Sequence, residues 1–270
     1  MIKAIAIGAF GIAASAAMLG LGYVAGSGPA SGSAGTPAVV ETAAAATARP
    51  EIEAIVRDYL LANPELMIEV QTALETKQRE QQRVAQLSII SDASETIFNA
   101  NYDGIVGNPD GKITVVEFFD YNCSFCKRAL ADMEAMVSAD PDLRFVMKEF
   151  PILGPESQQA HVVSMAFRTL MPEKYVQFHQ QLLGAAGQAG EASAVKLAVE
   201  LGADEAALRK EMANPAITQA FAATYDLANK LSISGTPSYV VGDEVVFGAL
   251  GKDVLEQKVA NLRSCQSATC

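Results

Sequence analysis

The order of apolar and polar positions separates an amino-terminal helical part from a mixed part. Residues 52–60 carry apolar side chains at helical spacing, and Asn63-Pro64 interrupts that run. A second helical stripe covers residues 66–74, and Pro64 is well suited to its first turn. A polar stretch then precedes further apolar residues near 84–90. We therefore expect two helices within residues 50–100, each with one apolar face.

Those two apolar faces need a partner, because two helices with one apolar face each make a poor core by themselves. Either the helices dock on the rest of their own chain, or they pair with the same segment of other copies and form an oligomer. The pattern alone leaves both alternatives open.

The mixed part, which we place at residues 101–264, begins with the pattern of a β-α-β unit. A short strand at 105–107 and an Asn-Pro-Asp-Gly turn precede a strand at 113–119. A helix to about residue 138 and a strand at 143–150 follow. A helix between two strands predicts parallel pairing with a right-handed crossover.

The remainder of this domain is mostly helical. Consecutive helical patterns fill residues 154–232. Strand patterns at 238–241 and 245–247 flank a Gly-Asp turn and predict an antiparallel hairpin. A helix at about 251–263 closes the domain, and residues 265–270 form a tail with two cysteines.

Two cysteines stand where the strand at 113–119 passes into the next helix, as Cys123-Ser124-Phe125-Cys126. Two thiols with this spacing can close and reopen a small disulfide ring. The free N–H groups and dipole at a helix start stabilise an anion, so we expect Cys123 to ionise more easily than an ordinary thiol. Because thiolate is the form that attacks disulfides, the motif predicts a redox site.

A zinc site and an inert structural disulfide are the alternatives for this pair. Zinc usually takes four ligands, but the other cysteines are Cys265 and Cys270, and the two histidines, His161 and His179, lie far apart in the sequence. That spacing suits no zinc motif. We therefore assign no metal ligands and favour redox chemistry.

Composition limits the classes of partner. At 270 residues, half of them apolar, the chain is long enough for one full domain and a smaller element. The formal charge of −11 argues against nucleic acid and anionic membrane surfaces as partners, because no basic cluster is present to neutralise phosphates.

Residues 1–28 have the composition of an export signal. One positive charge, Lys3, precedes an uncharged run at 4–25 that is close to the length needed to span a bilayer. We favour a cleaved signal over a retained anchor, since Gly and Ala dilute the hydrophobicity. Either outcome places the folded part outside the cytoplasm, in the periplasm, where disulfides persist. Residues 29–49 predict a flexible linker.

Three short sequences give the mixed part a family resemblance: residues 118–126, 148–151 (Lys-Glu-Phe-Pro) and 235–239 (Gly-Thr-Pro-Ser-Tyr). Over residues 101–263 the chain resembles the α/β thioredoxin fold with a helical insertion, as in the exported DsbA-like thiol-disulfide oxidoreductases. The helices before it resemble those of the ScsC (suppressor of copper sensitivity C) branch. In that branch such a segment can build a trimer, so the resemblance favours an oligomerisation segment.

The resemblance also implies roles for individual residues. Cys123 would be the nucleophile that forms a mixed disulfide with a client protein, and Cys126 the resolving thiol. Glu117 matches the family's buried acid, which can exchange a proton with Cys126, whereas an outward-facing edge position is its alternative. Pro237 matches the family's cis-proline, and Thr236 would offer backbone hydrogen bonds to an extended client.

The dipeptide Ser124-Phe125, which would also contact clients, tunes the redox potential. DsbA has a histidine there that stabilises the thiolate, and this chain has none nearby. The resemblance therefore favours a disulfide isomerase or reductase that acts on wrongly oxidised exported proteins through a redox-active disulfide, without a cofactor. A membrane donor of the DsbD or ScsB kind would supply electrons. The alternatives are a monomeric DsbA-like oxidase and a periplasmic protein that binds Cu(I) through its thiolates.

The remaining candidate residues receive structural interpretations. Cys265 and Cys270 enclose four residues and predict a structural disulfide, with a second redox pair as the alternative. His161 and His179 are expected to be surface or hydrogen-bonded groups rather than ligands. Four methionines are expected in the core rather than at a copper site: Met133, Met136, Met147 and Met165.

Overall fold

The computed structural model describes residues 43–270, with side chains from residue 49 onward. The predicted export signal at 1–28 and most of the predicted linker lie outside these residues. The chain divides into two units, one ending at Pro64 and the other running from Glu65 to Cys270. Among the helices of residues 43–270, none has the length and apolar character needed to cross a membrane.

The first unit contains helix α1 (Ala43–Ala62). It begins before the predicted linker ends at residue 49, so the expectation of a flexible segment is wrong for 43–49. Alanine is the strongest helix former, and four consecutive alanines start this helix. The apolar side chains of Ile52, Ile55 and Tyr59 are each more than half exposed.

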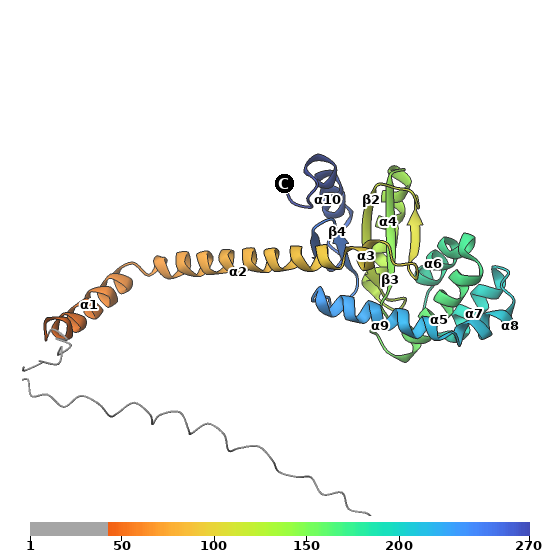
Figure 1. The fold of residues 1–270 in the computed structure, drawn as a ribbon, viewed down its shortest axis with the longest axis horizontal. Helices are drawn as coiled ribbons and strands as arrows, with labels where there is room; N and C mark the ends of the chain where they lie inside the picture. The colour runs from red at the N-terminus through yellow and green to blue at the C-terminus, as the bar shows by residue number, and fades with distance from the viewer. Residues whose placement is uncertain (1–42) are drawn as a thin grey trace, which may run out of the picture. The chain divides into compact units, whose positions relative to one another are not determined.

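The second unit begins with the long helix α2 (Glu65–Asp92) and the short helix α3 (Ser94–Phe98). Figure 1 shows α2 as a rod whose last turns reach the sheet. There Ile90 is buried, and the Val245 N–H donates to Gln86 Oε1 at 3.3 Å. Earlier in α2, the side chains of Met67 and Ile68 remain exposed. The predicted break between two helices at Asn63-Pro64 is confirmed.

A five-stranded sheet lies at the centre of the second unit, in the order β1-β3-β2-β4-β5. Strand β2 pairs in parallel with β3 and antiparallel with β4, while β1 and β5 pair antiparallel at the two edges. The predicted β-α-β unit and hairpin are therefore confirmed. The strands are β1 (Gly104–Gly107), β2 (Ile113–Phe119), β3 (Leu143–Glu149), β4 (Ser238–Val241) and β5 (Glu244–Phe247).

Helices cover both faces of this sheet. Alternate residues of β2 serve different cores: Val115 and Phe119 face one, and Val116 and Phe118 face the other. Helices α4 (Ser124–Ala139) and α10 (Lys252–Cys265) cover the first face, and α9 (Pro215–Lys230), α3 and the end of α2 cover the second.

The predicted helical insertion at 154–232 is confirmed. Before α9 it comprises α5 (Pro155–Leu170), η1 (Pro172–Lys174), α6 (Tyr175–Gly184), α7 (Glu191–Glu200) and α8 (Glu205–Met212). The four methionines expected in the core are all buried.

Candidate active site

The two cysteines of the Cys-Ser-Phe-Cys sequence lie at the first turn of α4. Cys123 is the N-cap residue, and its sulfur accepts the Cys126 N–H at 3.4 Å. A cysteine can take this position because its sulfur satisfies one of the free N–H groups of the helix start. Both thiols are reduced; Cys123 is 5% exposed and Cys126 is fully buried.

The surroundings of Cys123 favour its thiolate. The hydrogen bond from the Cys126 thiol is the main cause that lowers the pKa of Cys123, to about 5, with smaller contributions from the Thr236 side chain and from the Cys126 and Phe125 N–H groups. Partial burial opposes this shift. At pH 7 the Cys123 sulfur is therefore about 99% thiolate.

Cys126 is held in the opposite state. Burial raises the pKa of its thiol far above the ordinary value, and the hydrogen bond to Cys123 and the charge of Glu117 act in the same direction. The pair thus consists of one anion and one thiol that donates to it. This asymmetry suits a nucleophile at position 123 and a resolving thiol at 126.

Glu117 lies in the middle of the sheet, so the alternative of an outward-facing edge position is wrong. It occupies the central strand β2, between Met147 of β3 and Tyr239 of β4, and is 2% exposed. Burial first, and then the charge of Cys123, raise the pKa of Glu117 to about 8. At pH 7 about nine-tenths of this carboxyl is protonated.

The segment before β4 faces the nucleophile. The Thr236–Pro237 peptide bond is cis, and Cys123 Sγ lies 3.1 Å from the Thr236 carbonyl oxygen, to which it donates only in its thiol form. When Cys123 is ionised or bonded to a client, that carbonyl oxygen is free to accept another hydrogen bond. Ser124 and Phe125 are exposed beside it, and the Arg128 guanidinium lies 4.2 Å from the centre of the Phe125 ring.

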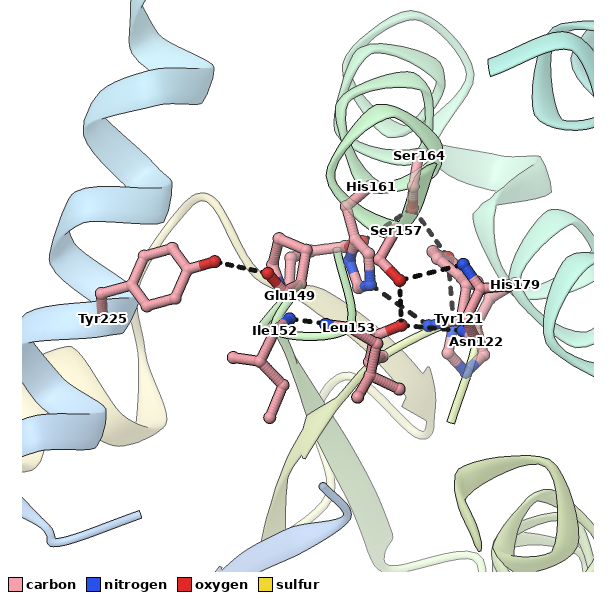
Figure 2. Close-up of polar contacts among 12 residues, drawn as sticks. Tyr121, Asn122, Glu149, Ile152, Leu153, Ser157, His161, Ser164, His179 and Tyr225 are labelled. Carbon is pink, nitrogen blue, oxygen red and sulfur yellow. Dashed lines mark hydrogen bonds and ion pairs between the residues drawn. The ribbon is translucent and has the colours of Figure 1, made fainter. Parts of the chain in front are cut away.

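The residues just before Cys123 form a buried polar network that the sequence analysis did not find. Asp120 is fully buried, and its carboxylate accepts hydrogen bonds from the Ile152 and Leu153 N–H groups and the Ser157 hydroxyl at 2.8–3.0 Å. Asn122 exchanges two hydrogen bonds with the backbone of Ala189. The nucleophile's loop is thereby fixed to the loop before α7 and to the start of α5, where Figure 2 shows Ser157 next to Asn122.

The two histidines belong to the same network. His161 Nε2 accepts the Tyr121 N–H at 3.2 Å, and its Nδ1 contacts the carboxylate of Glu149. His179 contacts the Tyr121 hydroxyl through Nδ1 at 3.3 Å, and its buried Nε2 has no protein partner within the described residues. The expectation of hydrogen-bonded groups is confirmed for His161, and neither histidine lies at the surface. Figure 2 shows these side chains converging between the strands and α5.

A second pair of cysteines lies away from this network. Cys265 and Cys270 form a disulfide at the end of α10. Within residues 43–270, no three His, Cys, Asp or Glu side chains gather in an arrangement that could hold a metal ion.

Two family profiles match the chain. The one described as the DSBA-like thioredoxin domain covers residues 114–260, and the one described as the copper resistance protein ScsC N-terminal domain covers residues 49–81. Two curated relatives are Na(+)/H(+) antiporters of Salinispora. The match to NhaA 1 of Salinispora arenicola has 23% identity over 159 residues, which is 59% of this chain but only 24% of that protein. The chain thus spans about a quarter of the length of these relatives.

Solved structures resemble the chain over a larger share of their length. A thioredoxin-like oxidoreductase from Silicibacter pomeroyi has 40% identity and a TM-score of 0.60, covering 63% of this chain and 98% of that one. The thiol-disulfide exchange protein alpha-DsbA2 from Wolbachia pipientis has 28% identity and a TM-score of 0.62, covering 68% and 98%. Proteus mirabilis ScsC in a transitional conformation has 28% identity and a TM-score of 0.60, covering 81% and 98%.

Proposed function

The chain belongs to the family of DSBA-like thioredoxin domains, and from this we propose that it is a disulfide isomerase and reductase for misoxidised exported proteins. The observation that carries the proposal is the opposite protonation of two adjacent sulfurs. Cys123 is a thiolate near neutral pH, while Cys126 keeps its proton. The thiolate of such a pair can attack a client disulfide, and the protonated thiol can later resolve the mixed disulfide.

The reaction begins when the Cys123 thiolate attacks one sulfur of a client disulfide. A Cys123–client disulfide forms, and the other client sulfur leaves as a thiolate. If a client thiolate then attacks the client sulfur of the mixed disulfide, Cys123 is released and the client has exchanged its bond without net oxidation. If Cys126 attacks Cys123 instead, the client leaves reduced and Cys123–Cys126 becomes the disulfide. A dithiol donor must then return two electrons.

Glu117 is suited to accept the proton that Cys126 loses in the second outcome. Its charge raises the pKa of Cys126, so the two groups interact. Formation of the mixed disulfide removes the charge of Cys123, which otherwise raises the pKa of both Glu117 and Cys126. Both groups therefore ionise more readily at the step that needs a base.

Three features support isomerisation over pure oxidation. Phe125 stands where DsbA has a histidine, the Thr236 carbonyl can accept a client N–H, and a segment that matches the ScsC N-terminal domain precedes the thioredoxin-like domain. Scrambled-ribonuclease reactivation and insulin reduction test the proposal in the wild type, Cys123→Ala and Cys126→Ala. We expect Cys123→Ala to lose both activities, and Cys126→Ala to lose mainly insulin reduction. Equal activity of the wild type and Cys123→Ala refutes the proposal; oxidation of reduced clients without reactivation supports the oxidase alternative.

We also propose that α1 and the first half of α2 assemble copies of the chain, as a trimer. Support comes from the ScsC N-terminal match at 49–81 and from the exposed apolar residues of these helices. The most exposed are Ile55, Leu61 and Ile68, at 68–69%. Burying such side chains stabilises an interface by about 1.5–3 kcal/mol each.

Light scattering tests the assembly. The full chain should have the mass of an oligomer, and Ile55→Glu/Leu61→Glu/Ile68→Glu should be monomeric with insulin reduction retained but ribonuclease reactivation weakened. Glu51→Gln, an exposed position on α1, is the control. A monomeric wild-type chain at micromolar concentration refutes this part of the proposal.

We place the protein in the periplasm, with a membrane dithiol donor of the DsbD or ScsB kind. The uncharged run at 4–25 and the Cys265–Cys270 disulfide support export, because disulfides of this type persist in oxidising compartments. A fusion of residues 1–49 to alkaline phosphatase tests it, since that enzyme is active only after export. An inactive fusion would contradict this placement.

A further inference from the structure

Residues 265–270, which we term the hook, fold back from the end of α10 onto the β4–β5 turn. The Ala268 N–H donates to Asp243 Oδ1 at 2.7 Å, the Ser267 hydroxyl to Asp243 Oδ2 at 2.8 Å, and the Thr269 hydroxyl to Glu244 Oε2 at 2.9 Å. The Ala268 side chain is 1% exposed. The hook is therefore held by several contacts besides the Cys265–Cys270 bond.

Because of these contacts, the disulfide is not the main interaction that holds the hook in place. The ring encloses only four residues, and such a short loop restricts the unfolded chain much less than a long one. Both cysteines of the hook are exposed, whereas both cysteines of the active site are buried. An exposed bond whose loss costs the fold little can be exchanged without unfolding the domain. Once it is broken, the hook is held by its hydrogen bonds alone and opens more easily.

The surroundings of the two sulfurs also differ in a way that directs an attack. Cys265 is the last residue of α10, where the helix dipole disfavours an anion. Cys270 Sγ lies 3.5 Å from the Ser264 hydroxyl, which can donate to it once it becomes a thiolate. Cys270 is thus the better leaving group, so a nucleophile is expected to bond to Cys265.

The hook also borders the surface of β5 and the β4–β5 turn on which the end of α2 packs, which we term the seat of α2. A groove of about 450 Å³ is lined by Arg83 and Gln86 of α2, by Asp243 at the turn, and by Ser267 and Thr269 of the hook. The hydrogen bond to Glu80 is the main cause that raises the pKa of Arg83, and the Asp243 charge across the groove adds a minor contribution in the same direction. Both carboxylate oxygens of Asp243 accept hydrogen bonds from the hook. Release of the hook therefore leaves this carboxylate without those partners, next to the end of α2.

We propose that Cys265–Cys270 is a second, exchangeable disulfide, a redox latch at the seat of α2 that the reduced Cys123–Cys126 pair of another copy opens. The Cys123 thiolate attacks Cys265 Sγ, a Cys123–Cys265 bond forms, and Cys270 leaves as a thiolate. Cys126 then loses its proton and attacks Cys123, which releases Cys265 as a thiolate. Two electrons have passed from the active-site dithiol to the hook. The choice of reductant rests on the proposed function; the exchangeability of the hook does not.

Two full-length variants test the transfer. The target, Cys123→Ser/Cys126→Ser, retains only the hook disulfide, and the attacker, Cys126→Ser/Cys265→Ser/Cys270→Ser, retains only Cys123. Mixing them should give a disulfide-linked dimer of the two variants that a reductant separates. Peptide mapping should find Cys123 of the attacker bonded to Cys265 of the target. Oxidised glutathione is the reference substrate for the attacker. Reaction with glutathione but not with the target overturns the choice of reductant and leaves the proposed function intact.

A second measurement uses the target alone with dithiothreitol, so it does not depend on Cys123. Alkylation and mass spectrometry should count two new thiols under native conditions, at a rate within about tenfold of that in urea. A disulfide that opens only after unfolding overturns the proposal. Amide exchange at Val245, which donates to Gln86, should rise about tenfold on opening. Unchanged exchange at Val245 overturns the latch.

Discussion

Glu117 places a titratable carboxyl where water does not reach, and its removal should stabilise the protein in alkaline solution. In the folded chain the pKa of Glu117 is raised from 4.5 to about 8, first by burial and then by the charge of Cys123. Between these two values the folded state keeps a proton that the unfolded state has released. Stability contributed by this group therefore falls as pH rises through that window.

The size of the effect follows from the two pKa values. Each unit of difference corresponds to about 1.4 kcal/mol. The penalty for ionising the buried carboxyl thus grows by about 4 kcal/mol between pH 5 and pH 9 and is nearly complete above pH 8. Glu117→Gln retains the shape of the side chain but cannot ionise. The unfolding free energy of the variant minus that of the wild type should therefore increase by about 4 kcal/mol from pH 5 to pH 9.

Urea unfolding followed by circular dichroism at pH 5, 7 and 9 measures the difference, with both proteins fully reduced. Cys123 titrates in the same range but is present in both proteins, so most of its contribution cancels. Glu134→Gln, an exposed position on α4, is the matched control and should show no such trend. If the difference between Glu117→Gln and the wild type stays constant within about 1 kcal/mol from pH 5 to 9, the assignment of a buried, protonated Glu117 is refuted.

Three further predictions concern the active site and the buried network. With a pKa of about 5, the alkylation rate of Cys123 by iodoacetamide should be nearly flat from pH 9 to pH 6 and fall about fivefold from pH 5 to pH 4; a rate that still climbs above pH 8 contradicts this. Lys148→Met leaves the buried Asp103 carboxylate without its partner, so urea unfolding at pH 8 should show a loss of about 3–5 kcal/mol. Because the pKa of Asp103 is raised to about 7 by burial, the loss should shrink at pH 5, where this carboxyl is neutral; a pH-independent loss speaks against the pairing. His161→Leu removes the acceptor of the Tyr121 N–H and should lower the unfolding free energy by about 1–3 kcal/mol, whereas His161→Gln, which can still accept that bond, should recover part of it; equal losses in both would disprove the role of the Nε2 acceptor.

The sequence carried the local signals of this protein. Apolar periodicity located the parallel β2–α4–β3 unit, the Gly-Asp turn located the β4–β5 hairpin, and Asn63-Pro64 marked the break between α1 and α2. These features depend on residues within one turn or one strand, so they can be read from neighbours in the chain. The same locality explains the placement of Cys123 at a helix start, which required only a strand followed by a helix.

The burial of Glu117 required the tertiary structure. Its position in β2 was clear from the sequence, but whether β2 was a central or an edge strand depended on pairing with both β3 and β4. Only that pairing, with α4 across the face, removes water from the carboxyl. Its raised pKa is therefore a property of the fold and not of the residues beside it.

The polar network next to the nucleophile was also decided by the fold. The bonds from Tyr121 to His161 and from Ser157 to Asp120 join residues 40 and 37 positions apart. No periodicity or spacing links such positions, because the strand ends and α5 meet only after the sheet and the insertion have packed. The amino-acid sequence thus determined the helices, the strands and the positions of the reactive cysteines. Only the tertiary structure decided how those cysteines are held and protonated, because it excludes water and brings distant polar groups together.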